Sequence, residues 1–179
     1  MTSNIYYVYK FLNDFAEPLY MFAITVVVYL LNYLIFKTSL RELKFKFILQ
    51  LKVILSSGLI VQLFKFAIGR YRFKEYLKCG NFGFEPFLGV GYSNSSFPSG
   101  HSSSIFTFVT ILLLLFYVDG KTSRVIKIFA YSFATLVAFS RLILRAHYLS
   151  DVIAGSLLGI ICAEILFRFF NKEEKKLTS

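Results

Sequence analysis

Apolar stretches of about twenty residues dominate this chain of 179 residues and leave little room for any other structure. A helix that crosses the hydrocarbon core of a bilayer needs about 20 apolar residues. Five stretches meet that requirement, roughly residues 18–36, 47–68, 99–118, 125–142 and 148–170. The hydrophobic content of 56% and the mean hydropathy of +0.63 agree with them. The sequence therefore predicts an all-α integral membrane protein, a single domain over residues 1–179 with a bundle of five to six transmembrane helices.

The first sixteen residues differ from these stretches because their apolar residues are spaced rather than continuous. They recur at the spacing of one helical face: Ile5, Val8, Phe11, Leu12 and Phe15. A short amphipathic helix of this kind lies in the plane of the membrane surface. We therefore expect an N-terminal interfacial helix before the transmembrane bundle.

The basic residues between the apolar stretches predict the orientation of the chain. Three segments that fall on one side of the bundle are rich in lysine and arginine: Lys37, Arg41, Lys44 and Lys46; Lys121 and Arg124; Lys172, Lys175 and Lys176. Cytoplasmic segments carry an excess of basic residues. This side and the C-terminus are therefore expected in the cytoplasm, with the N-terminus outside.

The opposite side is also basic, which orientation alone does not explain. It carries Lys65, Arg70, Arg72, Lys74, Lys78, Arg141 and Arg145. Topology and attraction to anionic lipids account for most of the formal charge of +10. Nucleic acid is not expected as a partner, because the chain has no soluble basic domain to hold it. The second basic cluster instead indicates an anionic ligand.

The connection over residues 70–97 is too apolar for a freely solvated loop. Its glycines, serines and single proline mark turns, and it also contains Phe82, Phe84, Phe87 and Leu88. We expect a lid that lies on the membrane surface. Cys79 lies in this lid and Cys162 lies well inside the last apolar stretch, so no disulfide between them is expected.

The chain has only two histidines, and each lies at the start of an apolar stretch on the second basic side. His147 and Asp151 are four residues apart, so on a helix they share a face. The carboxylate can then accept the imidazole Nδ1 proton, which leaves Nε2 free to act as a nucleophile. This pair predicts an oriented, catalytic imidazole.

The other polar residues at the same helix ends describe an anion site around that imidazole. Lys65, Arg72 and Arg141 are cationic donors that suit phosphate oxygens. Ser99 favours a helix start, and Gly100 lets backbone N–H groups approach a phosphate. His101 would lie beside the bound anion, where it can act as a general acid.

The order and spacing of these residues resemble the signature of the type 2 phosphatidic acid phosphatase (PAP2) family. Three segments carry the resemblance: Lys65 and Arg72, separated by six residues; Pro98, Ser99, Gly100 and His101; and Ser140, Arg141, His147 and Asp151. One position departs from the family pattern, because Phe73 stands where a proline usually follows the arginine. This departure affects the path of the loop more than its chemistry.

The resemblance implies a role for each residue. His147 would form a phosphohistidine, Asp151 would hold the imidazole tautomer, and His101 would protonate the leaving group and later activate water. The groups that bind the phosphoryl oxygens would be Lys65, Arg72, Arg141, Ser99 and Gly100. Arg145 and Arg70 are further candidates for substrate contact. No cofactor and no metal ion is implied.

The function implied by the resemblance is that of a metal-independent phosphatase in the bacterial inner membrane. Its active site would face the periplasm and remove a phosphate from a lipid headgroup, with the 1-phosphate of lipid A as the favoured substrate. Undecaprenyl diphosphate and phosphatidylglycerol phosphate are the alternative substrates within the family. Two other classes stay open, a lipid-to-lipid phosphotransferase and a non-catalytic lipid-binding or transport protein. The oligomeric state is not predicted.

Overall fold

The computed structural model describes residues 3–87, 91, 93–116 and 121–178. Helices make up most of these residues, and the described chain contains no strand beyond an isolated bridge between Arg70 and Phe84. The helices are α1 (Ser3–Asp14), α2 (Pro18–Leu34), α3 (Leu40–Ile68), α4 (Phe73–Cys79), α5 (Gly100–Phe116), α6 (Lys121–Ile143) and α7 (Leu149–Thr178). The all-helical architecture predicted from the sequence is therefore present.

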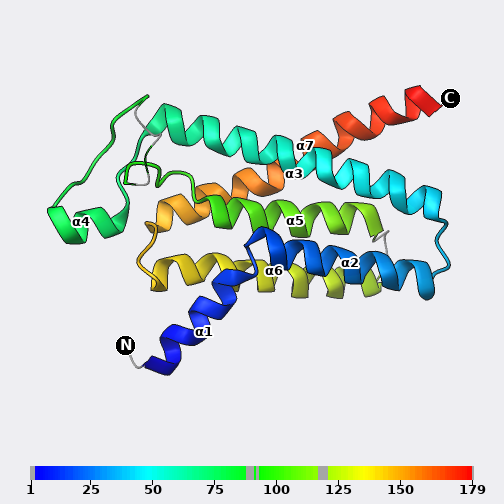
Figure 1. The fold of residues 1–179 in the computed structure, drawn as a ribbon, viewed down its shortest axis with the longest axis horizontal. Coiled ribbons are helices and arrows are strands. Elements are labelled where there is room, and N and C mark those ends of the chain that lie inside the picture. Colours follow the sequence, from blue (N-terminus) through cyan, green and yellow to red (C-terminus); the bar gives the residue numbers. More distant parts are fainter. Residues whose placement is uncertain (1–2, 88–90, 92, 117–120, 179) are drawn as a thin grey trace.

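The long helices run side by side along one axis (Figure 1). The end of α3, the start of α5, the end of α6 and the start of α7 meet at one end of the bundle, beside α4. We call this end the α4 end. The start of α3, the start of α6 and the C-terminus lie at the other end, so the structure brings the three basic segments of the predicted cytoplasmic side together.

Among the described residues, three helical segments are long and apolar enough to cross a membrane: Leu40–Ile68, Arg124–Ile143 and Leu149–Glu173. Helices α1 and α2 pass the same test only as a pair that is bent by 62°. Helix α5 is apolar but shorter. The chain is thus a multi-pass membrane protein, while the predicted total of five to six crossings is not confirmed and stays a prediction.

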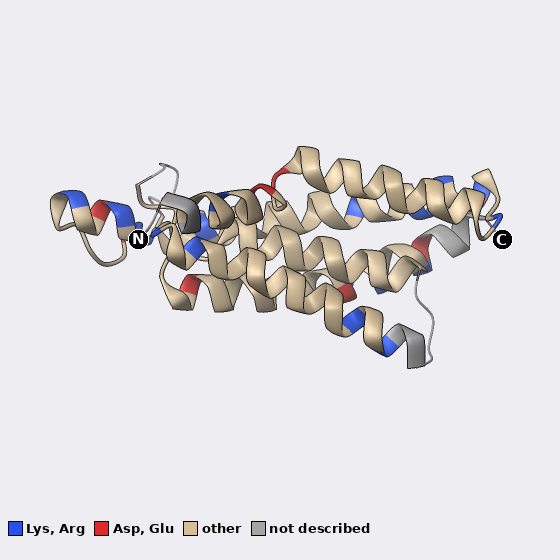
Figure 2. Cartoon of the chain, turned by 90° about the horizontal axis from the view of Figure 1, so that it is seen from below, with Lys and Arg blue, Asp and Glu red and all other residues tan. Residues whose placement is uncertain are grey.

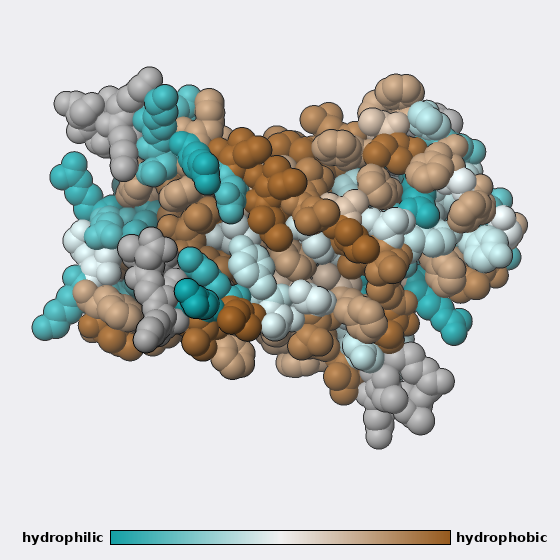
Figure 3. Space-filling model, turned by 180° about the vertical axis from the view of Figure 1, so that it is seen from behind, coloured by the Kyte–Doolittle hydropathy of each residue, from teal (hydrophilic) through white to brown (hydrophobic). Residues whose placement is uncertain are grey.

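Charge and hydropathy are distributed as this membrane arrangement requires. Lys and Arg lie mostly toward the two ends of the helices (Figure 2), and hydrophobic residues form a broad band between them (Figure 3). Many large apolar side chains on this band are exposed, which is unfavourable in water but normal against lipid.

Helix α3 begins seven residues before the predicted stretch at 47–68, so most of the basic segment between the first two stretches is helical. The Ser39 side chain accepts a hydrogen bond from the Glu42 backbone N–H at 3.2 Å and caps the helix. Glu42 then pairs with Lys46 at 2.9 Å, one turn later. Local capping therefore extends the helix beyond the apolar residues.

Helix α5 lies at the centre of the bundle and packs against α3, α6 and α7. Its contact with α7 is closest at two glycines, Gly155 and Gly159. A Cβ atom on Gly155 would lie 2.4 Å from the Ser99 carbonyl oxygen, and one on Gly159 would lie 2.5 Å from that of Ser103. Small residues four apart let two helix backbones approach in this way. We call this contact the α5–α7 seam.

Helix α1 turns away from α2 and packs against α6. The rings of Phe15 and Phe133 meet edge to face with centroids 5.1 Å apart, and Ala16 is buried beside them. Tyr7 and Phe11 remain exposed. An amphipathic helix therefore forms where the sequence predicted one, and its apolar residues divide between α6 and the surface.

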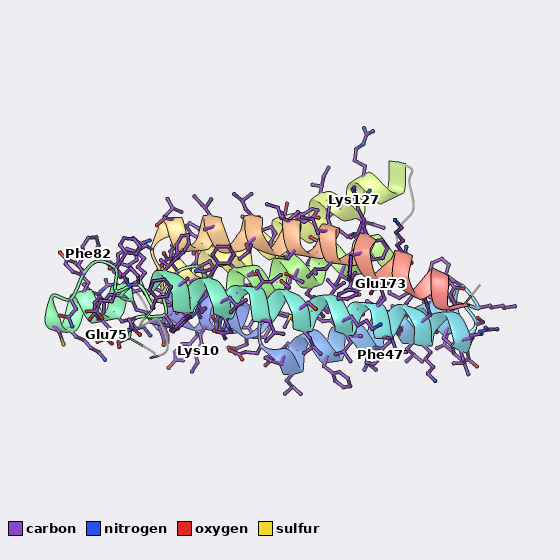
Figure 4. The ribbon with its side chains drawn as sticks, turned by 90° about the horizontal axis from the view of Figure 1, so that it is seen from above. Lys10, Phe47, Glu75, Phe82, Lys127 and Glu173 are labelled. Atoms are coloured by element: carbon purple, nitrogen blue, oxygen red, sulfur yellow. The ribbon has the colours of Figure 1, made fainter. Side chains whose placement is uncertain are left out.

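The predicted lid contains one element that the sequence pattern did not indicate, the seven-residue helix α4. The lid is fixed to α3 at Gly69, which has a φ of 57° and accepts a 2.8 Å hydrogen bond from the Glu85 N–H. Phe82, which Figure 4 labels at the α4 end, is exposed together with Phe84 and Phe87. Leu88 lies outside the described residues.

Candidate active site

The helix ends bring the predicted site residues together at the α4 end. Lys65 comes from the last turn of α3 and Arg141 from the last turn of α6. Asp151 lies in the first turn of α7, and His147 in the turn just before it. His101 is the second residue of α5. Residues up to 86 positions apart therefore contribute to one site.

The His147 ring is buried and points its Nδ1 atom at two oxygen atoms. Nδ1 lies 3.5 Å from Asp151 Oδ2 and 3.3 Å from Ser96 Oγ. Ser96 is itself buried and donates a 2.6 Å hydrogen bond to the same carboxylate oxygen. Because the single Ser96 proton goes to Asp151, its oxygen can accept the Nδ1 proton of His147. Ser96 thus contacts both His147 and Asp151, the pair predicted from the sequence, and His147 Nε2 faces away from Ser96 and Asp151.

Asp151 is fully buried, and its carboxylate has partners on both oxygens. Oδ2 also accepts a 3.0 Å hydrogen bond from the Tyr148 N–H. Oδ1 lies 2.6 Å from a terminal nitrogen of Arg70. The Arg70 guanidinium is stacked over the Tyr148 ring at 4.2 Å. Arg70 therefore contacts the Asp151 oxygen that does not face His147. Its contact with substrate stays a prediction.

Lys65 and Arg72 converge on the segment that precedes α5. Lys65 Nζ is buried and donates a 2.7 Å hydrogen bond to the Ser95 carbonyl oxygen. A terminal nitrogen of Arg72 lies 3.5 Å from Ser95 Oγ. A Cβ atom on Gly100 would be 3.8 Å from Lys65 Nζ, so the ammonium group lies against the start of α5. Two cations therefore face the predicted anion cradle.

The positive side chains and the burial of the site determine the protonation of His147. Burial is the main cause that lowers the pKa of His147 to about 4, and the charges of Arg141, Arg72 and Lys65 lower it further. The contact with Asp151 acts in the opposite direction. His147 is therefore neutral at physiological pH, which is the form that a nucleophile requires.

Ser99 connects the two helices of the α5–α7 seam at the site. Its backbone N–H donates a 3.0 Å hydrogen bond to the Asp151 carbonyl oxygen. Its Oγ atom lies 3.4 Å from the Ser102 N–H, the position expected for a helix-capping side chain, and accepts a 2.9 Å bond from Ser102 Oγ. The anion cradle at the start of α5 is thus fixed relative to Asp151.

Two residues, one in the last turn of α1 and one in the bend before α2, also reach the site, and the sequence did not predict either. Glu17 Oε1 lies 3.0 Å from His101 Nε2. The Asn13 side-chain oxygen accepts a hydrogen bond from Arg141. Neither residue carries a local pattern that indicates a function, and only the packing of α1 on α6 brings them here. Ser96 was not predicted either, because nothing in the sequence distinguishes it from the other serines of residues 93–104.

Arg145 lies outside this set of contacts. It is exposed in the turn between α6 and α7 and has a positive φ of 53°. Its contact with substrate stays a prediction.

Cys79 is exposed and Cys162 is buried, and both are free cysteines. Within the described ranges, no group of three His, Cys, Asp or Glu side chains is arranged to hold a metal ion.

The sequence profile of the PAP2 superfamily matches residues 46–175, which include every residue of this site except Asn13 and Glu17. The chain belongs to the PAP2 superfamily. Its match to the family begins inside α3 and ends near the end of α7, so α1 and α2 lie outside the matched PAP2 region.

Several curated PAP2 relatives are similar to parts of the chain. A lipid A 1-phosphatase from Rhizobium etli is 41% identical over 103 residues, which are 58% of this chain and 41% of that protein. Lipid phosphate phosphatase 1 from Arabidopsis thaliana is 30% identical over 177 residues, covering 87% of this chain and 53% of that protein. The chain thus spans about two fifths to one half of the length of these relatives.

Two solved structures share the fold over nearly the whole chain. The crystal structure of Aquifex aeolicus LpxE superposes with a TM-score of 0.65 at 20% identity, covering 94% of this chain and 88% of that one. A PAP2-type phosphatidylglycerolphosphate phosphatase from Bacillus subtilis gives a TM-score of 0.63 at 19% identity, covering 96% and 79%. The helical arrangement is therefore that of a PAP2 membrane protein.

Proposed function

We propose that this protein is a membrane lipid phosphatase that hydrolyses a phosphate from a lipid headgroup through a phosphohistidine intermediate. The observation that carries the proposal is the His147 ring. It is buried and neutral, its Nδ1 atom faces Ser96 and Asp151, and Lys65, Arg72 and Arg141 surround it with positive charge. A neutral, oriented imidazole inside a cationic pocket suits attack on a phosphate.

The proposed reaction has two steps. His147 Nε2 attacks phosphorus, the bond from phosphorus to the lipid oxygen breaks, and His101 gives its proton to that oxygen. Water then loses a proton to His101 and attacks phosphorus, the bond to His147 breaks, and inorganic phosphate leaves. Lys65, Arg72, Arg141, Ser99 and Gly100 bind the phosphoryl oxygens, whose charge is greatest in the transition states. These steps use only side chains and water.

The favoured substrate is the 1-phosphate of lipid A. The names of the Rhizobium relatives support this choice, and the membrane-spanning helices support a lipid rather than a water-soluble substrate. Undecaprenyl diphosphate and phosphatidylglycerol phosphate remain alternatives. We further propose a bundle of five to six transmembrane helices in the bacterial inner membrane, with the α4 end facing the periplasm. The basic residues at the opposite end support that orientation.

The test of the proposed function is phosphate release by the purified protein from lipid A, undecaprenyl diphosphate and phosphatidylglycerol phosphate in matched detergent micelles. We expect release by the wild type and, in His147→Ala, a loss of at least about 100-fold, because the nucleophile is absent. Arg168→Gln is the control, since Arg168 lies on the exposed surface of α7 and pairs with Glu164 there.

Two outcomes separate the proposal from its rivals. Transfer of phosphate to a second lipid without free phosphate would favour a phosphotransferase that uses the same histidine. Lipid binding without turnover, unchanged in His147→Ala, would favour a non-catalytic lipid-binding or transport protein. Either result would overturn the hydrolase proposal.

A further inference from the structure

A cavity of about 250 Å³ begins at the candidate active site and extends along the bundle between α3 and α5. At one end it is lined by Lys65, Gly100 and His101. Its other end reaches Ile54, eleven residues earlier in α3, which is about 16 Å at a helical rise of 1.5 Å per residue. We call this cavity the α3–α5 groove.

The groove opens on the outer surface of the bundle. Gln62 of α3 and Ser104 of α5 line it and are exposed. On the same helix, Leu59 and Leu63 are 68% and 67% exposed, as expected for side chains that face lipid. The groove therefore lies where a molecule in the bilayer can reach it from the side.

The lining of the groove is more polar than its surroundings. Five hydroxyl or amide side chains line it: Ser57, Gln62, Ser103, Ser104 and Thr107. Polar side chains within a membrane-spanning segment are costly unless they have partners, and they commonly mark a pathway or a binding site. A purely structural surface at this depth would be apolar.

The polar groups at the two ends of the groove differ in their hydrogen bonding. At the deep end, Ser57 and Thr107 lie 3.0 Å apart, and Thr107 also donates to the Gly159 carbonyl oxygen at 3.2 Å. Nearer the active site, Ser103 is 1% exposed, and its Oγ atom has no hydrogen-bond partner among the described residues. Leaving a buried hydroxyl without a partner costs about 1–3 kcal/mol. The hydroxyl group that lacks a hydrogen-bond partner, that of Ser103, therefore lies at the end of the groove next to the proposed phosphate site.

We infer that the α3–α5 groove binds the hydrogen-bonding groups of the lipid that lie directly beyond the phosphate, namely ester, amide or hydroxyl groups. This inference rests on the proposed function. It selects substrates in which the phosphate is carried by an acylated sugar or an acylated glycerol. A polyisoprenyl phosphate has only hydrocarbon at that position and would leave Gln62 and Ser103 without partners.

The size of the groove fits this role. Pockets for drug-sized molecules occupy roughly 300–1,000 Å³. At about 250 Å³ the groove holds only the part of a lipid next to its phosphate, and the acyl chains remain in the bilayer. A site built to hydrogen-bond its substrate also discriminates strongly against analogues that lack the bonding groups.

The test compares three lipids in the same mixed micelles: an acylated glucosamine 1-phosphate, a diacylglycerol phosphate and a polyprenyl phosphate. Phosphate release is measured for the wild type and for Gln62→Leu/Ser103→Ala. We expect the wild type to prefer the two acylated lipids by about 10- to 100-fold in kcat/KM, the range that one or two lost hydrogen bonds produce. The double variant should lose this preference and keep its rate on polyprenyl phosphate within about twofold.

Ser156→Ala is the matched control, because Ser156 lies in α7, outside the groove, and bonds the Val152 carbonyl oxygen of its own helix. A wild type without preference, or a double variant that slows on all three lipids equally, would overturn the inference. Binding of the corresponding non-hydrolysable phosphonates separates this inference from the proposed function. If no lipid is hydrolysed, the proposed function fails, and equal binding of acylated and polyprenyl phosphonates would overturn the groove inference as well.

Discussion

At the scale of single residues, the chemistry depends on how a buried carboxylate is held. Asp151 accepts hydrogen bonds from Ser96, from the Tyr148 backbone and from Arg70. A charge without such partners would be expensive to bury. His147 lies slightly farther from it, at 3.5 Å, and reaches it also through Ser96. Asp151 therefore orients the imidazole as part of a network rather than as one member of a pair.

The low pKa of His147 predicts how kcat/KM depends on pH. Its pKa of about 4 keeps the ring neutral at pH values where an ordinary imidazole, with a pKa near 6.5, binds a proton. After correction for ionisation of the substrate, we expect kcat/KM to hold down to about pH 5 and to fall by half near pH 4. Arg141→Gln removes a positive charge, so it should move this acid limb to higher pH. A wild-type limb near pH 6.5 would contradict the prediction.

The sequence predicted the side chains that we propose to react, but not all of those that contact them in the structure. His101, His147 and Asp151 could be assigned because each stands at the end of an apolar stretch, and topology alone brings such ends together. Ser96 was not predicted, and Arg70 was predicted only as a candidate for substrate contact and not as a partner of Asp151. Both lie in the connection 70–97, whose path depends on hydrogen bonds such as the one from the Ser96 N–H to the Arg70 carbonyl oxygen. An irregular connection of this kind lacks the repeating apolar pattern that identifies a helix in a sequence.

At the scale of helices, the bend between α1 and α2 is the element that most changes the expected site. Helix α1 was predicted as a surface element, yet Asn13 and Glu17 contact Arg141 and His101. The bend of 62° and the packing of Phe15 on Phe133 bring them to the site. The N-terminal segment therefore contributes to the site as well as to the bundle.

This contact predicts an effect of Glu17→Gln. The substitution keeps a side chain of the same size but removes the charge that stabilises a protonated His101. The Glu17 side chain is 48% exposed, so solvent weakens the pair to about 1 kcal/mol, and we expect kcat to fall about fivefold. Phosphate release under saturating lipid measures it.

Asp14→Asn is the matched control for that prediction. It removes the same charge three residues earlier, at the end of α1, and the Asp14 carboxylate contacts only the neighbouring Asn13 among the described residues, at 3.5 Å. Equal loss in both variants would mean that the bend acts through its net charge and not through the contact with His101.

At the scale of the whole molecule, the distribution of charge predicts an orientation that the two cysteines can test. Cys79 is exposed at the α4 end, and Cys162 is buried inside α7. If the α4 end faces the periplasm, a maleimide that does not cross the inner membrane should label Cys79 in intact spheroplasts. Thr38→Cys in a Cys79→Ser background, at the other end of the bundle, should be labelled only after permeabilisation. The reverse pattern would overturn the proposed orientation.

The architecture could be predicted at this scale because hydrophobic length alone identifies most of the helices. The number of crossings was harder to predict, because α2 and α5 fall slightly short of a full span in the structure. Helix α4 was missed for a related reason, since seven residues are too few for a periodic pattern to stand out.

The α5–α7 seam has a consequence for how such a protein can change over evolutionary time. The start of α5, with Ser99, Gly100 and His101, is joined to Asp151 by a backbone hydrogen bond and held close by Gly155. Gln62 lies on the exposed side of α3, lines the α3–α5 groove and belongs to neither helix of this seam. If the groove selects the lipid as we infer, substitution of Gln62 alters which lipids are accepted while Ser99, His101 and Asp151 keep their positions. On this proposal, substrate range can change through Gln62 separately from the reaction chemistry.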